Sequence, residues 1–219
     1  MAAELKPHIS LEFAEGIAMG IEKKMKRGEL FQFPKTMAKG GAGVHSTGCV
    51  EQNIGDSAKP NRSASRQRQV AQGSNAAKAH RNFIWLPWME GAVNYAEQQG
   101  KDVLSGPFSG CYMIRYRHGG ATWRVAHVHT PGAIPAWNAL AAQNGFEISC
   151  GFKPYVRKVD EGNFDKWYGI VSDDGLCFRV WAGETEYGID PTVGLRRIKE
   201  VKIVPSIPPA NLRVLTAMA

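Results

Sequence analysis

The sequence predicts a β-rich α/β domain, with a sandwich-like antiparallel or mixed sheet and two or three flanking helices. Three observations support this fold class. Short apolar segments follow one another between glycine-containing turns, which is typical of strands. Segments with helical periodicity are few, and no internal repeat is evident.

The N-terminal part is expected to form one helix and one strand. A helix capped by serine is expected over Ser10–Arg27, and its apolar stripe includes Ile21 and Met25. Gly28 is expected to end it, because glycine readily adopts the left-handed conformation that follows many helices. A short strand, Leu30–Phe33, is expected next.

Downstream, strands are expected to dominate. They cover residues 83–88, 110–117, 121–129 and 146–156, and the segment RRIKEVKIV near the C-terminus. A short helix is expected at about 136–143, between the third and fourth of these strands. Hairpin turns are expected at His118–Gly120 and at Asp174–Gly175 because glycine supplies the positive φ that such turns require.

Composition predicts a single domain over residues 1–219 with no membrane-spanning helix, because no apolar run approaches the roughly 20 residues that a span needs. No Sec-type signal is expected at the N-terminus. The net charge is +7, and residues 57–81 contain six Lys or Arg and no acid. A segment this polar buries too little apolar surface to offset the entropy lost when a chain becomes ordered. A mobile basic loop is therefore expected at about 55–81. It has no aromatic residue on which a base could stack, which disfavours a nucleic-acid partner.

The first hairpin is expected to bring a thiol to an imidazole. If His118–Gly120 is a three-residue loop, Cys111 lies directly opposite His127, with Cβ atoms about 5 Å apart. A five-residue loop would instead place Cys111 opposite His129. An imidazole that takes the thiol proton lowers the cysteine pKa and makes the thiolate a nucleophile. The preceding Ser109 and Gly110 are expected to form a site loop beside a developing oxyanion.

The other cysteines are predicted to have no catalytic role. No CxxC motif occurs, which disfavours a structural zinc finger. Cys150 and Cys177 are expected to be core residues, because a free cysteine behaves as a small hydrophobic residue. Cys49 remains unassigned. A cation–π contact between Arg115 and Trp123 is also expected.

Three segments around this hairpin resemble a known family. Phe108–Cys111 (Phe-Ser-Gly-Cys) resembles the Leu-Ser-Gly-Cys motif of the cytotoxic necrotizing factor glutamine deamidases. Ile84–Trp88 (Ile-Trp-Leu-Pro-Trp) and His127–Pro131 (His-Val-His-Thr-Pro) look most like segments of Burkholderia lethal factor, a toxin of the same family. The resemblance covers about residues 83–131, and Phe108 replaces the usual Leu.

The resemblance implies a bacterial toxin or effector that deamidates a glutamine of a host protein to glutamate. The family's targets are Rho-type GTPases or a translation-initiation helicase, and its members need no metal or organic cofactor. Cys111 would be the nucleophile and His127 its base, with His129 as the alternative base; Ser105 matches the upstream residue whose oxygen orients the histidine. Such a protein would be secreted or delivered into the host cytoplasm.

Other functions stay open at this point. Cys111, His127 and His129 are residue types that bind zinc, which leaves a zinc-dependent hydrolase as an alternative. The same dyad would serve a cysteine protease or an acyl-transferring amidase. A third class is a non-enzymatic binding module that acts through the basic loop.

Overall fold

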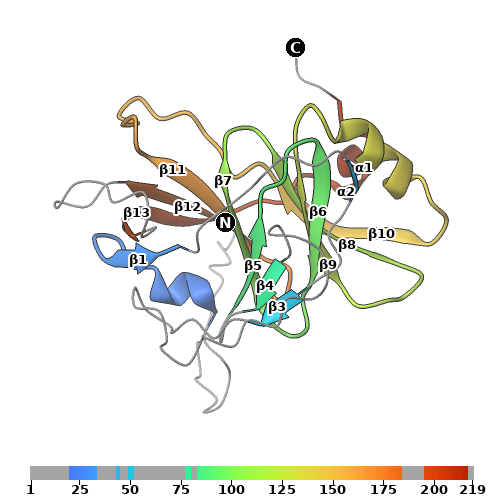
Figure 1. Ribbon diagram of the computed structural model, residues 1–219, viewed down its shortest axis with the longest axis horizontal. Helices are drawn as coiled ribbons and strands as arrows, with labels where there is room; N and C mark the ends of the chain where they lie inside the picture. Colours follow the sequence, from blue (N-terminus) through green and yellow to red (C-terminus); the bar gives the residue numbers. More distant parts are fainter. Residues whose placement is uncertain are drawn as a thin grey trace, which may run out of the picture.

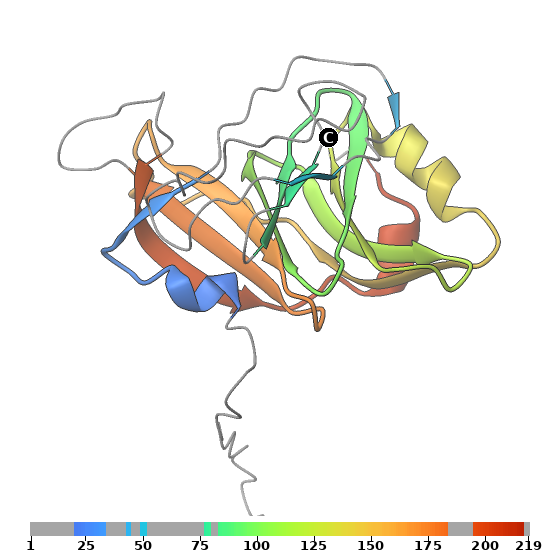
Figure 2. The same ribbon diagram turned by 60° about the horizontal axis from the view of Figure 1, so that its bottom comes forward.

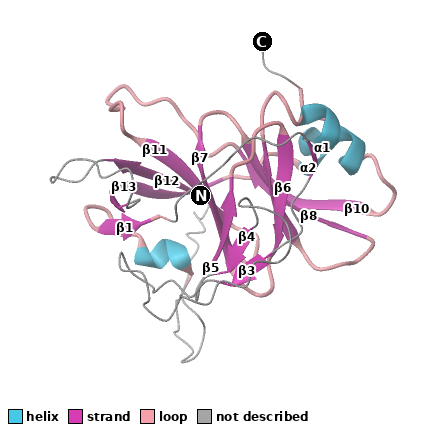
Figure 3. Cartoon of the chain, in the orientation of Figure 1, coloured by secondary structure: helices cyan, strands magenta, loops and turns pink. Residues whose placement is uncertain are grey.

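The protein folds into two packed sheets with short helices on their outer faces (Figure 1). The computed structural model describes residues 20–33, 43–44, 49–51, 77–79, 83–183 and 195–216. Within these residues strands dominate and helices are short, as Figure 3 shows. The predicted fold class, a β-rich sandwich-like α/β domain with mixed sheets, is therefore confirmed.

The larger sheet has eight strands and is mixed. In spatial order its strands are β1 (Leu30–Gln32), β13 (Leu195–Val204), β12 (Cys177–Gly183), β11 (Lys166–Val171), β7 (Asp102–Phe108), β5 (Phe83–Pro87), β4 (Ala77–Ala79) and β3 (Cys49–Glu51). β5 and β7 pair in parallel, as do β3 and β4, whereas the other neighbours are antiparallel. Every residue of β5 is buried, because both faces of this central strand are covered.

The smaller sheet has five strands. In spatial order they are β10 (Phe146–Phe152), β8 (Tyr112–His118), β9 (Arg124–Val128), β6 (Ala92–Glu97) and β2 (Gly43–Val44). β2 pairs with β6 in parallel, and the remaining pairs are antiparallel.

Three apolar clusters hold the layers together. The central one joins side chains of both sheets, for example Leu86 and Trp167 from the larger sheet and Met113 and Phe152 from the smaller. The second packs α1 (Ile134–Ala141) and α2 (Pro209–Arg213) on the outer face of the smaller sheet, and the third packs η1 (Ile21–Lys24) on the outer face of the larger. Figure 2 shows the helices on these opposite sides.

Most expected elements of residues 83–183 are present with shifted ends. β5, β8, β9, β10, β13 and α1 correspond to the expected segments, and β11 and β12 form the hairpin that turns at Asp174–Gly175. The thiols of Cys150 and Cys177 are buried in the central cluster, as predicted. Strands β6 and β7 were not expected, because Gly106 and Pro107 in β7 are residues that normally interrupt strands.

The N-terminal predictions are tested only in part. Residues 10–19 of the expected Ser10–Arg27 helix lie outside the described residues. The described part forms the 3₁₀ helix η1, which ends before Arg27, although Ile21 and Met25 are buried as the stripe predicted. Most of the expected basic loop also lies outside the described residues, and the part that is described, Ala77–Ala79, forms β4.

The predicted register of the first hairpin is wrong. β8 and β9 pair Met113 with His127 and Tyr112 with Val128, so the continued register places Cys111 opposite His129 rather than His127. The cause is a longer connection. The end of β8 pairs with β10, and Gly119 N–H donates to the Gly145 carbonyl at 3.0 Å, which draws the tip of β8 away from β9.

The connection is also held by the tryptophan at its C-terminal end. The guanidinium groups of Arg115 and Arg117 lie 4.4 and 4.5 Å from the centre of the Trp123 ring. The predicted Arg115–Trp123 cation–π contact is therefore present, although Arg115 pairs with Val125 in the ladder.

Candidate active site

A hollow of about 530 Å³ lies where β8 begins and where β5 and β9 end. Its lining contains the expected nucleophile and site loop: Ser109, Gly110 and Cys111. Trp88, His129, Thr130, Pro131 and Lys153 also line it. The segments that carried the family resemblance thus converge on one depression, although they come from both sheets.

Cys111 lies at the inner wall of this hollow and is 4% exposed. Burial raises the pKa of its thiol, while hydrogen bonds with Thr130 and Trp88 oppose this rise. The expectation that a neighbouring histidine lowers the pKa of Cys111 is therefore wrong for the resting protein. The sulfur is held as a neutral thiol by its apolar surroundings.

Gly110 shapes the entry to Cys111. Its φ of +154° is strained for residues with a side chain, and a Cβ there would lie 3.8 Å from Thr130 Oγ1. The backbone therefore turns into β8 close to the loop that follows β9. This places Cys111, the next residue, in the wall of the hollow.

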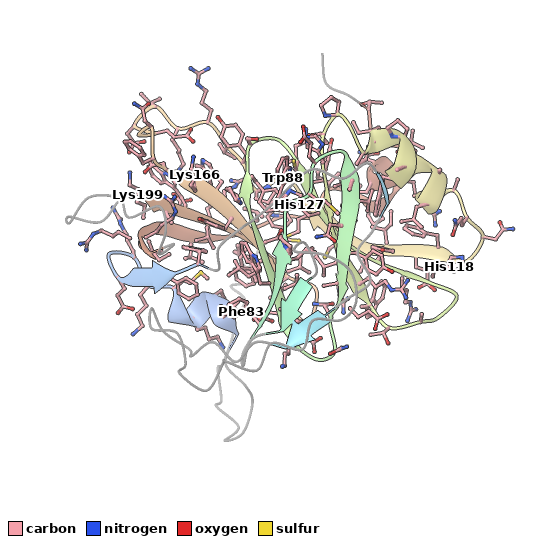
Figure 4. The ribbon with its side chains drawn as sticks, in the orientation of Figure 1. Phe83, Trp88, His118, His127, Lys166 and Lys199 are labelled. Atoms are coloured by element: carbon pink, nitrogen blue, oxygen red, sulfur yellow. The ribbon has the colours of Figure 1, made fainter. Side chains whose placement is uncertain are left out.

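His127 comes from β9, is 1% exposed and is not among the residues that line the hollow. Figure 4 shows His127 and Trp88 in the region where the two sheets meet. The imidazole is stacked on the Phe108 ring, with centroids 4.1 Å apart and planes inclined by 10°. Burial, and then the charge of His129, lowers the pKa of His127 to about 3, so this ring is neutral at pH 7.

Ser105 fixes which nitrogen of His127 carries the proton. The Ser105 hydroxyl, on β7, donates to the Leu86 carbonyl at 2.6 Å, and its oxygen lies 2.8 Å from His127 Nδ1. Since the hydroxyl proton is used on Leu86, Nδ1 must donate to the serine oxygen. His127 Nε2 then holds a lone pair, as a proton acceptor requires.

His127 Nε2 is buried and has no hydrogen-bond partner among the residues that the structure describes. An unpartnered buried nitrogen is costly in a protein interior and calls for an explanation; Trp85 Nε1 and Glu22 Oε2 are in the same state. Met113 lies opposite His127, and Cys111 precedes Met113 by two residues. Continuing this pairing places Cys111 and His127 diagonally on the same face of the sheet. No hydrogen bond joins them in the resting state, and catalytic hydrogen bonds often tighten only when substrate binds.

His129 has the opposite tautomer. Gly91 N–H donates to His129 Nδ1 at 2.7 Å, so the neutral ring carries its proton on Nε2. The ring meets Trp88 edge to face, with centroids 5.5 Å apart, and it lines the hollow beside Cys111. His129 is therefore a hydrogen-bond donor, whereas His127 is an acceptor.

The zinc-site alternative gains no support from this geometry. No group of three or more His, Cys, Asp or Glu side chains is placed to bind a metal ion within the described part of the chain. Of the three residues considered, each histidine has its Nδ1 in a hydrogen bond, to Ser105 or to Gly91.

Sequence reasoning missed several parts of the hollow. Thr130 and Trp88 were noticed only as parts of resembling segments, and Lys153 was not noticed at all. Lys153 reaches the site because β10 pairs with β8, and its ammonium lies 4.5 Å from the centre of the Tyr112 ring. No local spacing signals a contact that depends on strand pairing.

Comparison with known proteins adds no relative. No family model matches the chain, and no curated protein or solved structure matches it significantly. None of the described helices is long and apolar enough to cross a membrane. The case for a function therefore depends on the residues of this site.

Proposed function

We propose that the protein is a cysteine-dependent glutamine deamidase, a bacterial toxin or effector that converts a glutamine side chain of a host protein to glutamate. The observation that carries the proposal is the state of His127. Its Nδ1 proton is fixed by Ser105, and its Nε2 lone pair is buried and unpartnered on the sheet face that Cys111 shares. The resemblance of Phe108–Cys111 and His127–Pro131 to deamidase toxins supports the same reaction.

The proposed reaction passes through a thioester. The Cys111 sulfur attacks the carboxamide carbon while His127 Nε2 accepts the thiol proton. The proton then passes from His127 to the leaving nitrogen, so the C–N bond breaks and ammonia departs. Water attacks the thioester carbon, its proton goes to His127, and the C–S bond breaks to give glutamate and the thiol.

Other groups of the hollow stabilise the developing charge in this scheme. The carboxamide oxygen becomes an oxyanion when sulfur attacks, and it needs donors that are already in place. The backbone amide of Cys111 and the Nε2–H of His129 are the proposed donors. Lys153 adds a positive charge to the same wall.

Intact-mass measurement tests the proposal. Candidate host proteins, chosen first among Rho-type GTPases and translation-initiation helicases, are incubated with the protein. A gain of about one dalton per modified side chain and release of one ammonia are expected, because O–H replaces N–H₂. Cleavage into fragments would instead assign the dyad to a protease.

Variants assign the roles. Cys111→Ser is expected to abolish conversion, and His127→Ala to lower kcat by roughly 10²–10⁴-fold, the usual contribution of a general base. His129→Ala is expected to cost less, roughly tenfold to a few hundredfold, the range for one oxyanion donor. The reverse order of the two histidine variants would transfer the base role to His129, and full activity of Cys111→Ser would refute the nucleophile.

A further inference from the structure

A second hollow, of about 790 Å³, adjoins the one that Cys111 lines. The two share Pro107 and Ser109 as a common wall. We call the larger one the 155–167 groove, because most of its lining comes from the segment between Tyr155 and Trp167, which leads from β10 into β11. A chain that presents one side chain to Cys111 would pass over this wall into the groove.

The groove is lined by one exposed apolar side chain. Val159 is fully exposed in the lining, whereas Val156 and the half-exposed Phe164 belong to the same segment without lining the groove. These residues lie outside the three apolar clusters of the fold. Exposed apolar groups rimmed by charges are typical of a surface that contacts another molecule.

The charges of the groove do not cancel. Both oxygens of Glu161 accept hydrogen bonds from Lys158 N–H and Trp167 Nε1. Asp165 is paired with Lys199 at 2.8 Å and is nearly inaccessible.

The cations of the groove are satisfied unequally. Lys158 is paired with Glu200 at 3.1 Å. Arg157 and Lys166, by contrast, have no ion pair among the residues that the structure describes. Figure 4 shows Lys166 at the same upper side of the molecule as Trp88, which lines the neighbouring hollow. The groove therefore offers two cations without an ion pair, Arg157 and Lys166, beside the exposed Val159. Glu161, which is hydrogen-bonded to uncharged donors, is its one carboxylate without an ion pair among the described residues.

We infer that the 155–167 groove binds the polypeptide segment that flanks the reactive glutamine, and that this segment is acidic with at least one apolar side chain. The inference rests on the proposed function, because it takes the Cys111 hollow as the place where the carboxamide reacts. Charge complementarity selects the occupant: the free cations Arg157 and Lys166 meet carboxylates, and Val159 meets the apolar side chain. Since Pro107 and Ser109 separate the two hollows, the contacts lie only a few residues from the glutamine.

Binding of two short peptides to the Cys111→Ala protein tests the inference. One fluorescein-labelled peptide has a central glutamine flanked on each side by leucine and two aspartates; the other has lysines in place of the aspartates. Fluorescence anisotropy is expected to show about fivefold or tighter binding of the acidic peptide, the scale of two partly exposed charge pairs. Raising the ionic strength from about 0.05 M to about 0.5 M is expected to remove most of the preference.

Charge-reversal variants separate the groove from the general positive charge of the protein. Arg157→Glu with Lys166→Glu is expected to abolish or invert the preference. Lys26→Glu with Lys202→Glu changes the net charge equally at exposed positions of other elements and is expected to keep it. Equal loss in both double variants would refute the groove, and so would equal binding of the two peptides.

Two further outcomes are decisive. The labelled acidic peptide is displaced either by its unlabelled form or by a single-stranded oligonucleotide. If the oligonucleotide displaces it at the lower concentration, the proposed occupant is wrong. Because Cys111→Ala binds without reacting, the assay is independent of catalysis. Preferential binding of the acidic peptide, without deamidation of any glutamine by the unmodified protein, would refute the deamidase proposal but leave the groove as a site for acidic peptides. Deamidation without preferential binding of the acidic peptide would refute only the inference about the groove.

Discussion

Cys111 and His127 are both held neutral by burial in the resting protein. Burial raises the pKa of the thiol and lowers that of the imidazole to about 3, so an ion pair between them is unfavourable. In the proposed reaction a thiolate therefore forms only as the substrate closes the site and its carbon receives the sulfur. This differs from cysteine enzymes that store a thiolate–imidazolium pair before substrate binds.

The neutral thiol predicts slow alkylation at neutral pH. The rate at which iodoacetamide modifies Cys111 is expected to rise continuously as the pH increases beyond 9, since burial raises the pKa of this thiol. Peptide mapping by mass spectrometry measures the rate at Cys111 separately from those at Cys150 and Cys177. Cys111→Ala provides the baseline. A plateau of fast alkylation reached below pH 7 would show a stored thiolate and contradict this description.

Among the elements, β7 holds the proposed base, His127, through Ser105, although the sequence gives little sign of this strand. Gly106 and Pro107 argue against a strand, but a Cβ at Gly106 would lie 2.5 Å from the Tyr168 ring, so glycine is required by packing against β11. The contact between Ser105 and His127 depends on β7 and β9 belonging to different sheets that face each other. Single-strand patterns do not contain that information, and only the family resemblance pointed to Ser105.

The hairpin shows a second limit of local reasoning. Both strands and the turn glycines were predicted, and Cys111 and His127 do share a face, because the predicted and observed registers differ by an even number of positions. The preferred partner of Cys111, His127, was wrong, and the observed register is that of the five-residue alternative, which places Cys111 opposite His129. The sequence could not choose between the two because the loop length depends on the pairing of β8 with β10 and on the contacts of Trp123.

Replacing Ser105 tests the link between β7 and β9. Ser105→Ala leaves the Leu86 carbonyl and His127 Nδ1 without their hydroxyl, which is expected to cost about 1–3 kcal/mol of unfolding free energy. Loss of ring orientation is expected to lower kcat roughly tenfold to a hundredfold with little change in KM. Ser105→Thr retains the hydroxyl and is the matched control. Equal kcat for the alanine and threonine variants would limit Ser105 to a structural role.

At the scale of the molecule, the sandwich places the proposed catalytic residues at the junction of its layers. The proposed nucleophile, Cys111, precedes β8 of the smaller sheet, Ser105 is on β7 of the larger, and the central cluster lies between the sheets. The sequence predicted strands and their apolar character, but it did not predict how they divide between two sheets. That division depends on long-range pairing such as β5 with β7, which no local pattern specifies.

The buried neutral histidine couples the site to the stability of the whole fold. The pKa of His127 is about 3 in the folded protein against an ordinary 6.5. Below pH 6.5 His127 binds a proton in the unfolded chain but not in the folded one. The free energy of unfolding therefore decreases as the pH falls. Over the window from pH 6.5 to about 3 this single group costs about 1.4 kcal/mol per pH unit.

Urea unfolding of the unmodified protein and of His127→Gln between pH 7 and pH 4 measures this linkage. The variant is expected to lose less stability on acidification, by about 2–3 kcal/mol at pH 4.5, because glutamine takes up no proton. Glu22 and Asp102, whose pKa values burial raises, contribute with the opposite sign, but equally in both proteins. The comparison therefore isolates His127, and parallel stability curves for the two proteins would mean that its ring is accessible to protons in the folded state.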